Sequence, residues 1–335
     1  MRLKYYIIII AFFTCFTSCE QVLFEDKIET NDPFVNFEYL WNECNEKYSY
    51  FDLKDVNWED VKNKYSGKIY NGMSEDSLFN VLGGMLKELK DDHANLISNF
   101  KTSFYGVEYQ SQDNFDWRII IDNYFDSQFN ITGPFTHNFI ENQQMGYIRL
   151  SSFVNEIEPS HLDYILDKYK DTKGLVFDVR ENGGGAIINV YAILSRFIND
   201  QTLVYYSRIK SGKGINDFSE AKKVYIQPYY GKRYTKDIVL ITDRGTYSSG
   251  SLITLASKAI PHITIIGDTT GGGLGMPNGG QLPNGWRYRF SITQTLTLDK
   301  KTDYENGVPP DISVNFDWND LKKDEILDRA IEELQ

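Results

Sequence analysis

Two short, mostly apolar runs constrain the fold of this chain more than any other feature. The runs at residues 174–179 and 237–242 do not alternate regularly between apolar and polar residues, which is typical of strands buried on both faces of a sheet. Each run is followed by a loop rich in glycine or hydroxyl residues and then by a helical pattern. This order of strand, loop and helix predicts an α/β fold with a partly parallel sheet. Further strands are expected at residues 145–150 and 263–267.

The chain before these strands has the pattern of a small helical unit. Apolar residues recur at helical spacing after Asp32, after Asn57 and after Ser74, and each of these three residues is a good N-cap. The third stripe, at residues 78–89, is the most regular. We therefore expect an N-terminal helical domain at residues 32–100.

The first eighteen residues have the pattern of an export signal. Arg2 and Lys4 precede an apolar run at residues 5–16, which as a helix would rise only about 18 Å, too short for a hydrocarbon core of about 30 Å. Small residues then lead to Cys19. We expect residues 1–18 to be a signal peptide that is removed from the mature protein.

The end of this signal resembles a bacterial lipoprotein signal. That resemblance implies cleavage before Cys19 and attachment of lipid to this cysteine, with the polar residues 19–31 as a tether. The expected location is then the bacterial cell envelope, periplasmic or surface-facing, with a lipid anchor in a membrane. An ordinary secretory signal remains the alternative.

Charge and residue types exclude several classes of partner. The sequence has 35 basic and 47 acidic residues, a net charge of −12, so it lacks the basic surface that nucleic acid requires. The pair Asp92-His93 has no second histidine or cysteine pair at ligand spacing, and we expect no metal site and no cofactor. Cys44 lies on the apolar face of the first helix and is expected in the core.

The loops after the two buried strands could form an acyl-transfer site. The loop at residues 246–250 offers Ser248 or Ser249 as a nucleophile, and the glycines at 183–185 offer backbone N–H groups that a substrate can approach closely. The alternative from spacing alone is that the serines only cap a helix and the glycines only turn the chain.

Five segments in order resemble the C-terminal processing peptidase family of serine proteases, in the branch that includes the tricorn core. The resemblance implies a crotonase-like α/β fold and hydrolysis of peptide bonds. The segments are Asp91-Asp92-His93-Ala94-Asn95-Leu96, Val176-Phe177-Asp178-Val179-Arg180-Glu181-Asn182-Gly183-Gly184-Gly185, Thr246-Tyr247-Ser248-Ser249-Gly250, Ile266-Gly267-Asp268-Thr269-Thr270-Gly271-Gly272-Gly273 and Asn306-Gly307-Val308-Pro309-Pro310-Asp311.

The resemblance also implies roles for single residues. One branch of the family uses a lysine about 25 residues after the nucleophile. This chain has Gly271–Gly275 at that distance, and there is no lysine in or near this segment. The tricorn-core branch uses a histidine and a glutamate, which match His93 and Glu305. Ser248 is then the nucleophile, His93 the general base and Glu305 the third member of the catalytic set. The oxyanion hole would consist of the Ser249 N–H and the Gly183 or Gly184 N–H.

The remaining organisation combines the residue pattern with the resemblance. Residues 101–142 are expected to connect the helical domain to a catalytic core at 143–335, with a strand at 117–121. Many family members carry a PDZ domain at this point, but the connection is too short for one. The expected substrate is a peptide or unfolded protein. Two rivals are a non-catalytic protein that binds a peptide or lipophilic ligand on the same fold, and an esterase-like hydrolase.

Overall fold

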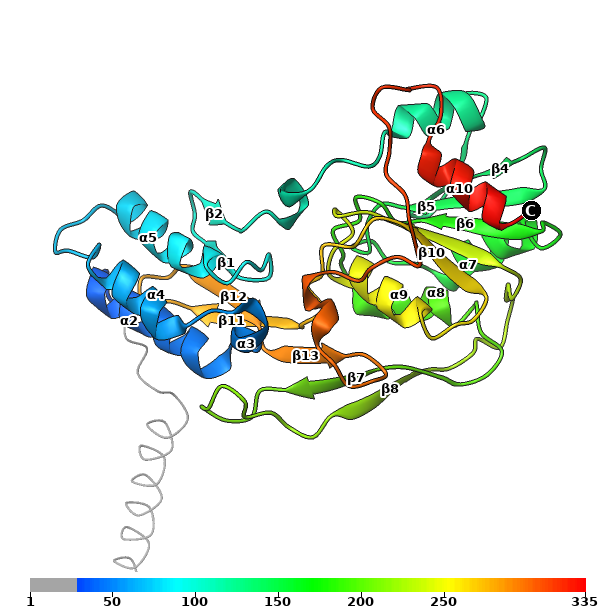
Figure 1. Ribbon diagram of the computed structural model, residues 1–335. Helices are drawn as coiled ribbons and strands as arrows, with labels where there is room; N and C mark the ends of the chain where they lie inside the picture. The colour runs from blue at the N-terminus through cyan, green and yellow to red at the C-terminus, as the bar shows by residue number, and fades with distance from the viewer. Residues whose placement is uncertain (1–28) are drawn as a thin grey trace, which may run out of the picture.

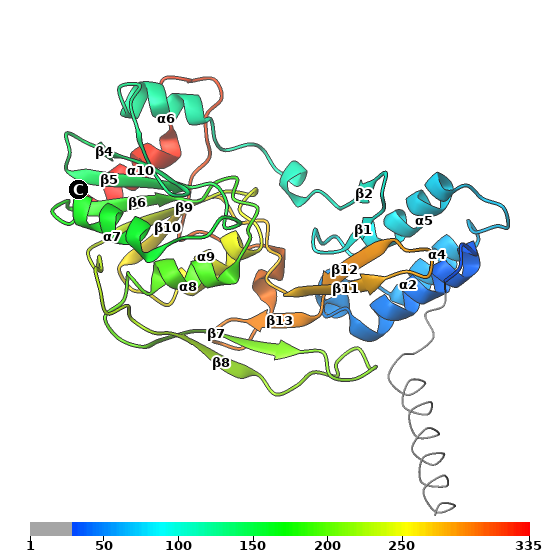
Figure 2. The same cartoon turned by 180° about the vertical axis from the view of Figure 1, so that it is seen from behind.

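The computed structural model describes residues 29–335 (Figures 1 and 2). The expected signal peptide and Cys19 lie outside the described residues. Among the helices that are described, none is long and apolar enough to cross a membrane.

Four helices form the N-terminal part of the described chain. Their N-terminal caps follow the sequence pattern: the carboxylate of Asp32 accepts the N–H groups of Phe34 and Val35, and Ser74 accepts the N–H of Ser77. The expected starts after Asp32, Asn57 and Ser74 are confirmed. The helices are α2 (Pro33–Lys47), α3 (Phe51–Lys54), α4 (Trp58–Ser66) and α5 (Glu75–Lys87).

A four-stranded sheet packs against these helices and joins distant parts of the chain. Its order is β11-β12-β1-β2, so the strand that follows α5 pairs with a hairpin made almost 200 residues later (Figure 1, where the hairpin is orange). One face of the sheet carries Leu96, Tyr288 and Phe290, which pack with Leu40, Leu82 and the buried Cys44. The strands are β1 (Asn95–Ile97), β2 (Thr102–Ser103), β11 (Pro277–Gln281) and β12 (Arg287–Ser291).

A seven-stranded sheet forms the centre of the second half, with the order β14-β10-β9-β6-β5-β4-β3. The strands from β14 to β5 run parallel, and β4 and β3 add an antiparallel edge. All residues of β5, β6 and β9 are buried, as the mostly apolar runs predict for β6 and β9. The strands are β3 (Asn130–Thr132), β4 (Phe135–Ile140), β5 (Met145–Leu150), β6 (Gly174–Asp178), β9 (Ile238–Thr242), β10 (Ile263–Gly267) and β14 (Ile312–Ser313).

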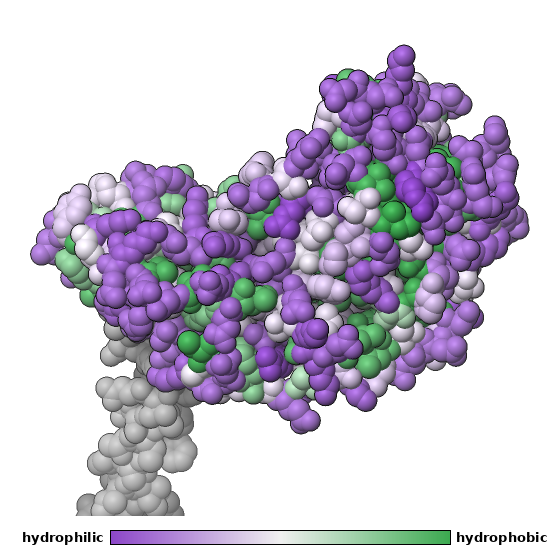
Figure 3. Space-filling model, viewed as in Figure 1, coloured by the Kyte–Doolittle hydropathy of each residue, from purple (hydrophilic) through white to green (hydrophobic). Residues whose placement is uncertain are grey.

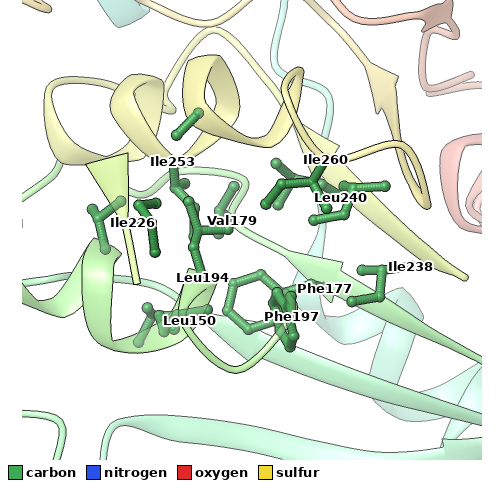
Figure 4. Close-up of a cluster of buried hydrophobic side chains, with 14 of the residues drawn as sticks. Leu150, Phe177, Val179, Leu194, Phe197, Ile226, Ile238, Leu240, Ile253 and Ile260 are labelled. Atoms are coloured by element: carbon green, nitrogen blue, oxygen red, sulfur yellow. The ribbon is translucent and has the colours of Figure 1, made fainter. Parts of the chain in front are cut away.

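Helices cover both faces of this sheet, so the expected α/β fold with a partly parallel sheet is confirmed. One face packs against α7 (Pro159–Lys168), α8 (Ile187–Leu194) and α9 (Ser249–Ser257), and Figure 4 shows part of this core, with Phe177, Leu240 and Ile253. The other face packs against α6 (Trp117–Tyr124) and α10 (Glu325–Glu333).

The expected strand at residues 117–121 is wrong, because this segment is the helix α6. The carboxylate of Asp116 accepts the N–H of Arg118 and caps the helix. Ile119 and Ile120 are both buried in the core on the sheet. Adjacent apolar residues occur both in helices that pack one face on a sheet and in buried strands. The local pattern therefore could not distinguish a helix from a strand here.

The remaining described elements belong to neither of these two sheets. The strands β7 (Thr202–Ile209), β8 (Lys222–Ile226) and β13 (Thr293–Leu296) form a third sheet, with β7 in the middle. Two short 3-10 helices are η1 (Val107–Gln110) and η2 (Asp303–Asn306). The face of the molecule shown in Figure 3 is mostly hydrophilic, with smaller apolar patches between polar side chains.

Candidate active site

Ser248 lies at a strained position between strand β9 and helix α9. Its backbone has φ 56° and ψ −116°, which a residue with a side chain rarely adopts and which costs about 1–3 kcal/mol. The Ser248 N–H donates to the Gly272 carbonyl at 2.9 Å, and its own carbonyl accepts the Leu252 N–H at 2.9 Å. The surrounding backbone therefore holds the serine at the N-terminus of a helix, in the lining of a pocket.

His93 meets this serine from the other sheet. It lies between α5 and β1, and its Nε2 is 3.0 Å from Ser248 Oγ. The edge of the Tyr247 ring packs against the imidazole, with ring centroids 5.1 Å apart. This distance is within the range at which a base can take the proton of a serine.

Asp91 is buried beside His93 and is surrounded by hydrogen-bond donors. Its carboxylate accepts the His93 N–H at 2.8 Å and the hydroxyls of Tyr247 at 2.9 Å, Tyr48 at 3.1 Å and Ser291 at 3.1 Å. Burial alone would raise its pKa, but the positive charges of His93 and Lys54 and these hydrogen bonds lower the pKa of Asp91 below its usual value. Asp91 therefore carries a negative charge inside the site.

Ser291 joins this carboxylate to the imidazole. Its Oγ is 3.1 Å from Asp91 Oδ2 and 3.4 Å from His93 Nδ1, so the carboxylate oxygen and the ring nitrogen are no more than about 6.5 Å apart. Ser291 is fully buried at the end of β12. The ring is thus held between Ser248 on one side and the Asp91–Ser291 pair on the other.

Glu305 is also buried but forms no hydrogen bond with His93 within the described part of the chain. Its Oε2 accepts the N–H groups of Leu274 at 2.8 Å and Gly275 at 3.0 Å, while its Oε1 has no partner among residues 29–335. Burial, followed by the nearby charge of Asp91, raises the pKa of Glu305 to about 8. Glu305 therefore fixes the loop at 274–275 and is protonated at neutral pH.

The pKa of His93 is lowered from its usual value. Burial has the largest effect, the Asp91 charge opposes it, and the positive charge of Arg289 adds to the lowering. The backbone of Gly275, which Glu305 holds, lies beside the ring and raises the pKa. His93 is consequently a neutral imidazole at neutral pH and can accept a proton.

Backbone N–H groups face the same region from two loops. The Gly184 N–H donates to the Asn182 side chain at 3.0 Å, and Gly184 lies so close to Ser248 that a Cβ there would be 2.7 Å from the serine Cβ. The N–H groups of Gly183 and Ser249 have no hydrogen-bond partner among the described residues. The geometry therefore favours Gly183 over Gly184 as a donor to a bound oxygen, with Ser249 as the second donor.

A pocket of about 600 Å³ is lined by His93, Gly183, Ser248 and Ser249. Its walls are partly apolar, and Ile187, Tyr205, Leu252, Leu274 and Met276 contribute to them. A pocket with apolar walls and a few convergent polar groups is typical of a substrate site.

Sequence reasoning did not identify every group of the site. Asp91 belongs to the quoted Asp91-Asp92-His93 segment, but nothing in the sequence distinguished it from Asp92, whose carboxylate accepts the N–H groups of Gly106 and Val107. Ser291 was missed because 198 positions separate it from His93. Only the pairing of β1 with β12 brings the two together.

The other histidines lie away from this pocket. His161 caps α7, accepting the Glu158 N–H through Nδ1. His137 is buried and bonded to Thr132 and Tyr169, and burial lowers its pKa to about 4. The contacts of both side chains are structural.

Known proteins match this chain over most of its length. Residues 144–314 match Peptidase family S41, and residues 31–87 match the Tricorn protease C1 domain. A crystal structure of a candidate peptidase from Parabacteroides merdae is 37% identical, with a TM-score of 0.86 over 91% of this chain and 97% of that chain. The crystal structure of mature CPAF shares the fold, with a TM-score of 0.66 at 11% identity over 91% and 96% of the two chains.

A curated relative matches about half of this chain. The carboxy-terminal processing protease CtpB of Bacillus subtilis is 25% identical over 177 residues, which are 52% of this chain and 35% of CtpB. The match thus spans about a third of the length of that relative. The family matches agree with the resemblance drawn from the five sequence segments, and the chain belongs to peptidase family S41.

Proposed function

We propose that this protein is a serine-type peptidase that cleaves peptide bonds through an acyl-enzyme on Ser248. The contact of 3.0 Å between His93 Nε2 and Ser248 Oγ carries the proposal, together with two N–H groups in the same pocket that have no hydrogen-bond partner among residues 29–335. The family name and the printed names of the relatives support peptide bonds as the target.

The geometry supports the following steps. His93 Nε2 takes the proton as Ser248 Oγ bonds to the carbonyl carbon of the substrate, and the carbonyl electron pair moves to oxygen. The N–H groups of Ser249 and Gly183 stabilise that oxyanion. His93 then gives the proton to the leaving amine, and a water activated by the same imidazole hydrolyses the ester. Glu305 is a positioning residue, because it acts through Leu274 and Gly275.

The division of the chain is part of the proposal. The helices α2–α5 support an N-terminal helical domain at 32–100, and the seven-stranded sheet supports a crotonase-like catalytic core at 143–335. Residues 101–142 connect them and contribute β3 and β4 to the edge of the sheet. The hairpin β11–β12 belongs to the core by sequence and to the helical domain by packing.

The location rests on the N-terminal sequence. The basic start, the short apolar run and Cys19 support export and a lipid anchor in the bacterial envelope. Cys19→Ser should release the protein from the membrane fraction. Unchanged processing and membrane partitioning of this variant would contradict the lipoprotein assignment.

The activity is tested with a fluorophosphonate, which labels an activated serine. Mass spectrometry should find the label on Ser248, and Ser248→Ala should abolish it while Ser249→Ala retains it. His93→Ala should lose labelling and nearly all peptide hydrolysis, with circular dichroism unchanged, because several orders of magnitude in turnover depend on such a base. His161→Ala is the matched control and should retain activity. Labelling at Ser249, or none at Ser248, would refute the assignment.

A further inference from the structure

A groove next to the candidate active site lies along the open face of the four-stranded sheet. Alternate residues of β12 point to opposite faces: Tyr288 and Phe290 are buried against the helices, while Arg287 and Arg289 are exposed on the other face. These two arginines line a groove of about 1160 Å³. Arg289 also lines the pocket of Ser248, so the two spaces adjoin at this side chain.

The register of the strands places Arg289 close to the base. Arg289 pairs with Asn95, which follows His93 by two residues, and Arg289 and His93 line the same pocket. Arg287 pairs with Ile97, one row further away. On the other side Arg289 pairs with Gly279, which has no side chain to cover the guanidinium.

Neither arginine has a carboxylate partner among residues 29–335, where Arg149, Arg180 and Arg196 all do. Arg289 donates only through Nε, to Asn95 Oδ1 at 2.5 Å, which directs the guanidinium without neutralising it. Glu75 is the one acidic residue in the described lining of the groove. In a chain of net charge −12, Arg289 at the pocket of the reacting serine and Arg287 in the adjoining groove form a positive site.

We propose that Arg289, supported by Arg287, binds a carboxylate of the substrate peptide close to the bond that Ser248 attacks. The inference rests on the proposed peptidase function. A guanidinium is planar, stays charged at all relevant pH values and can bind both oxygens of a carboxylate. The carboxylate can be the free C-terminus of the peptide or the side chain of an aspartate or glutamate near the cleaved bond, and both have this chemistry.

Binding to the full-length Ser248→Ala variant tests the inference without requiring catalysis. Fluorescent peptides of one sequence are compared by anisotropy with a free C-terminal carboxylate or a C-terminal amide. A second pair, both amidated, carries aspartate or asparagine near the C-terminus. At least one carboxylate peptide should bind about tenfold or more tightly than its neutral partner, as expected for a hydrogen-bonded charge pair. The pair that shows the difference identifies the source of the carboxylate.

Variants of the arginines locate the effect. In the Ser248→Ala background, Arg289→Gln should reduce the carboxylate preference to about twofold or less, and Arg289→Lys should retain part of it. Arg118→Gln is the charge-matched control, because this arginine is exposed on α6, and it should leave the preference unchanged. Equal binding of both members of every pair, no saturable binding of any carboxylate peptide, or an equal effect of Arg118→Gln would overturn the inference. Failure of the peptidase function has a separate signature, the lack of fluorophosphonate labelling at Ser248 in the wild type.

Discussion

The pH dependence of hydrolysis can separate the roles of the two buried carboxyl groups beside His93. Asp91 is charged, whereas Glu305 is protonated up to about pH 8, because two carboxylates in one buried site do not readily ionise together. Only Asp91 can therefore stabilise the imidazolium at the acid limb of the profile. We compare Glu305→Gln with the double variant that also carries Asp91→Asn, since in Asp91→Asn alone Glu305 would ionise more easily and replace the lost charge.

The expected magnitude follows from the distance. Asp91 Oδ2 lies within about 6.5 Å of His93 Nδ1. At an effective dielectric constant of about 20, a unit charge at this distance contributes roughly 2–3 kcal/mol to the imidazolium, which is up to about two pH units. Loss of this charge lowers the pKa of His93 further, so the acid midpoint should move down by about one to two pH units.

The assay is kcat/KM for a quenched peptide between pH 4 and 9, because this ratio reports groups of the free enzyme. Wild type should show an acid midpoint below 6.5, since the pKa of His93 is lowered from that value. Glu305→Gln should keep this midpoint and remove a second transition near pH 8. Ser291→Ala, which keeps the Asp91 charge and removes only the bridging hydroxyl, should lower the rate more than it moves the midpoint.

The assignment of the charge to Asp91 fails if the acid midpoint shifts in Glu305→Gln and not on addition of Asp91→Asn. A downward shift of a full pH unit in Glu305→Gln, with no further shift when Asp91→Asn is added, would assign the charge to Glu305. Labelling of Ser248 by the fluorophosphonate at pH 7 checks that each variant retains a folded site.

Three further predictions concern stability and the donor loops. Because the pKa of Glu305 is raised in the folded protein, its contribution to stability is lost as pH rises from about 4.5 through about 8. The free energy of unfolding in urea should therefore fall more between pH 5 and pH 9 for wild type than for Glu305→Gln. Gly184→Ala should lose most hydrolysis, measured as kcat/KM, because φ is +100° and the new Cβ would lie 2.7 Å from the Cβ of Ser248. Arg180→Gln should destabilise the fold by about 3–5 kcal/mol in denaturant titration, because it removes the arginine that pairs with the buried carboxylates of Asp178 and Asp324 and leaves Asp178 only the more distant Arg149; a loss below 1 kcal/mol would contradict this.

The helix starts and the buried strands could be predicted from the sequence because local chemistry determines them. Asp32, Asn57 and Ser74 each accept backbone N–H groups at the start of a helix, a role that depends only on the next few residues. Unbroken apolar runs likewise suffice to place strands such as β6 and β9 in the interior.

The rest of the site depends on contacts between distant segments. The resemblance supplied Ser248 and His93, and the structure brings these two within 3.0 Å. It did not supply Ser291, because no local pattern tells which serine of a strand will face a histidine from another part of the chain. Arg289 was missed for the same reason, since its position beside the base follows from the β1–β12 register.

That register also has a consequence for the timing of assembly during synthesis. When the first 280 residues have been synthesised, both Ser248 and His93 are present. Two supporting parts are still missing: β12, which pairs with the strand after His93, and Glu305, which binds the N–H of Gly275 beside the imidazole. We therefore expect nascent and truncated chains without these residues to be inactive, with hydrolysis beginning only once β12 and Glu305 have been synthesised. Late completion of the site would keep the peptidase from cleaving neighbouring unfolded proteins during its own synthesis.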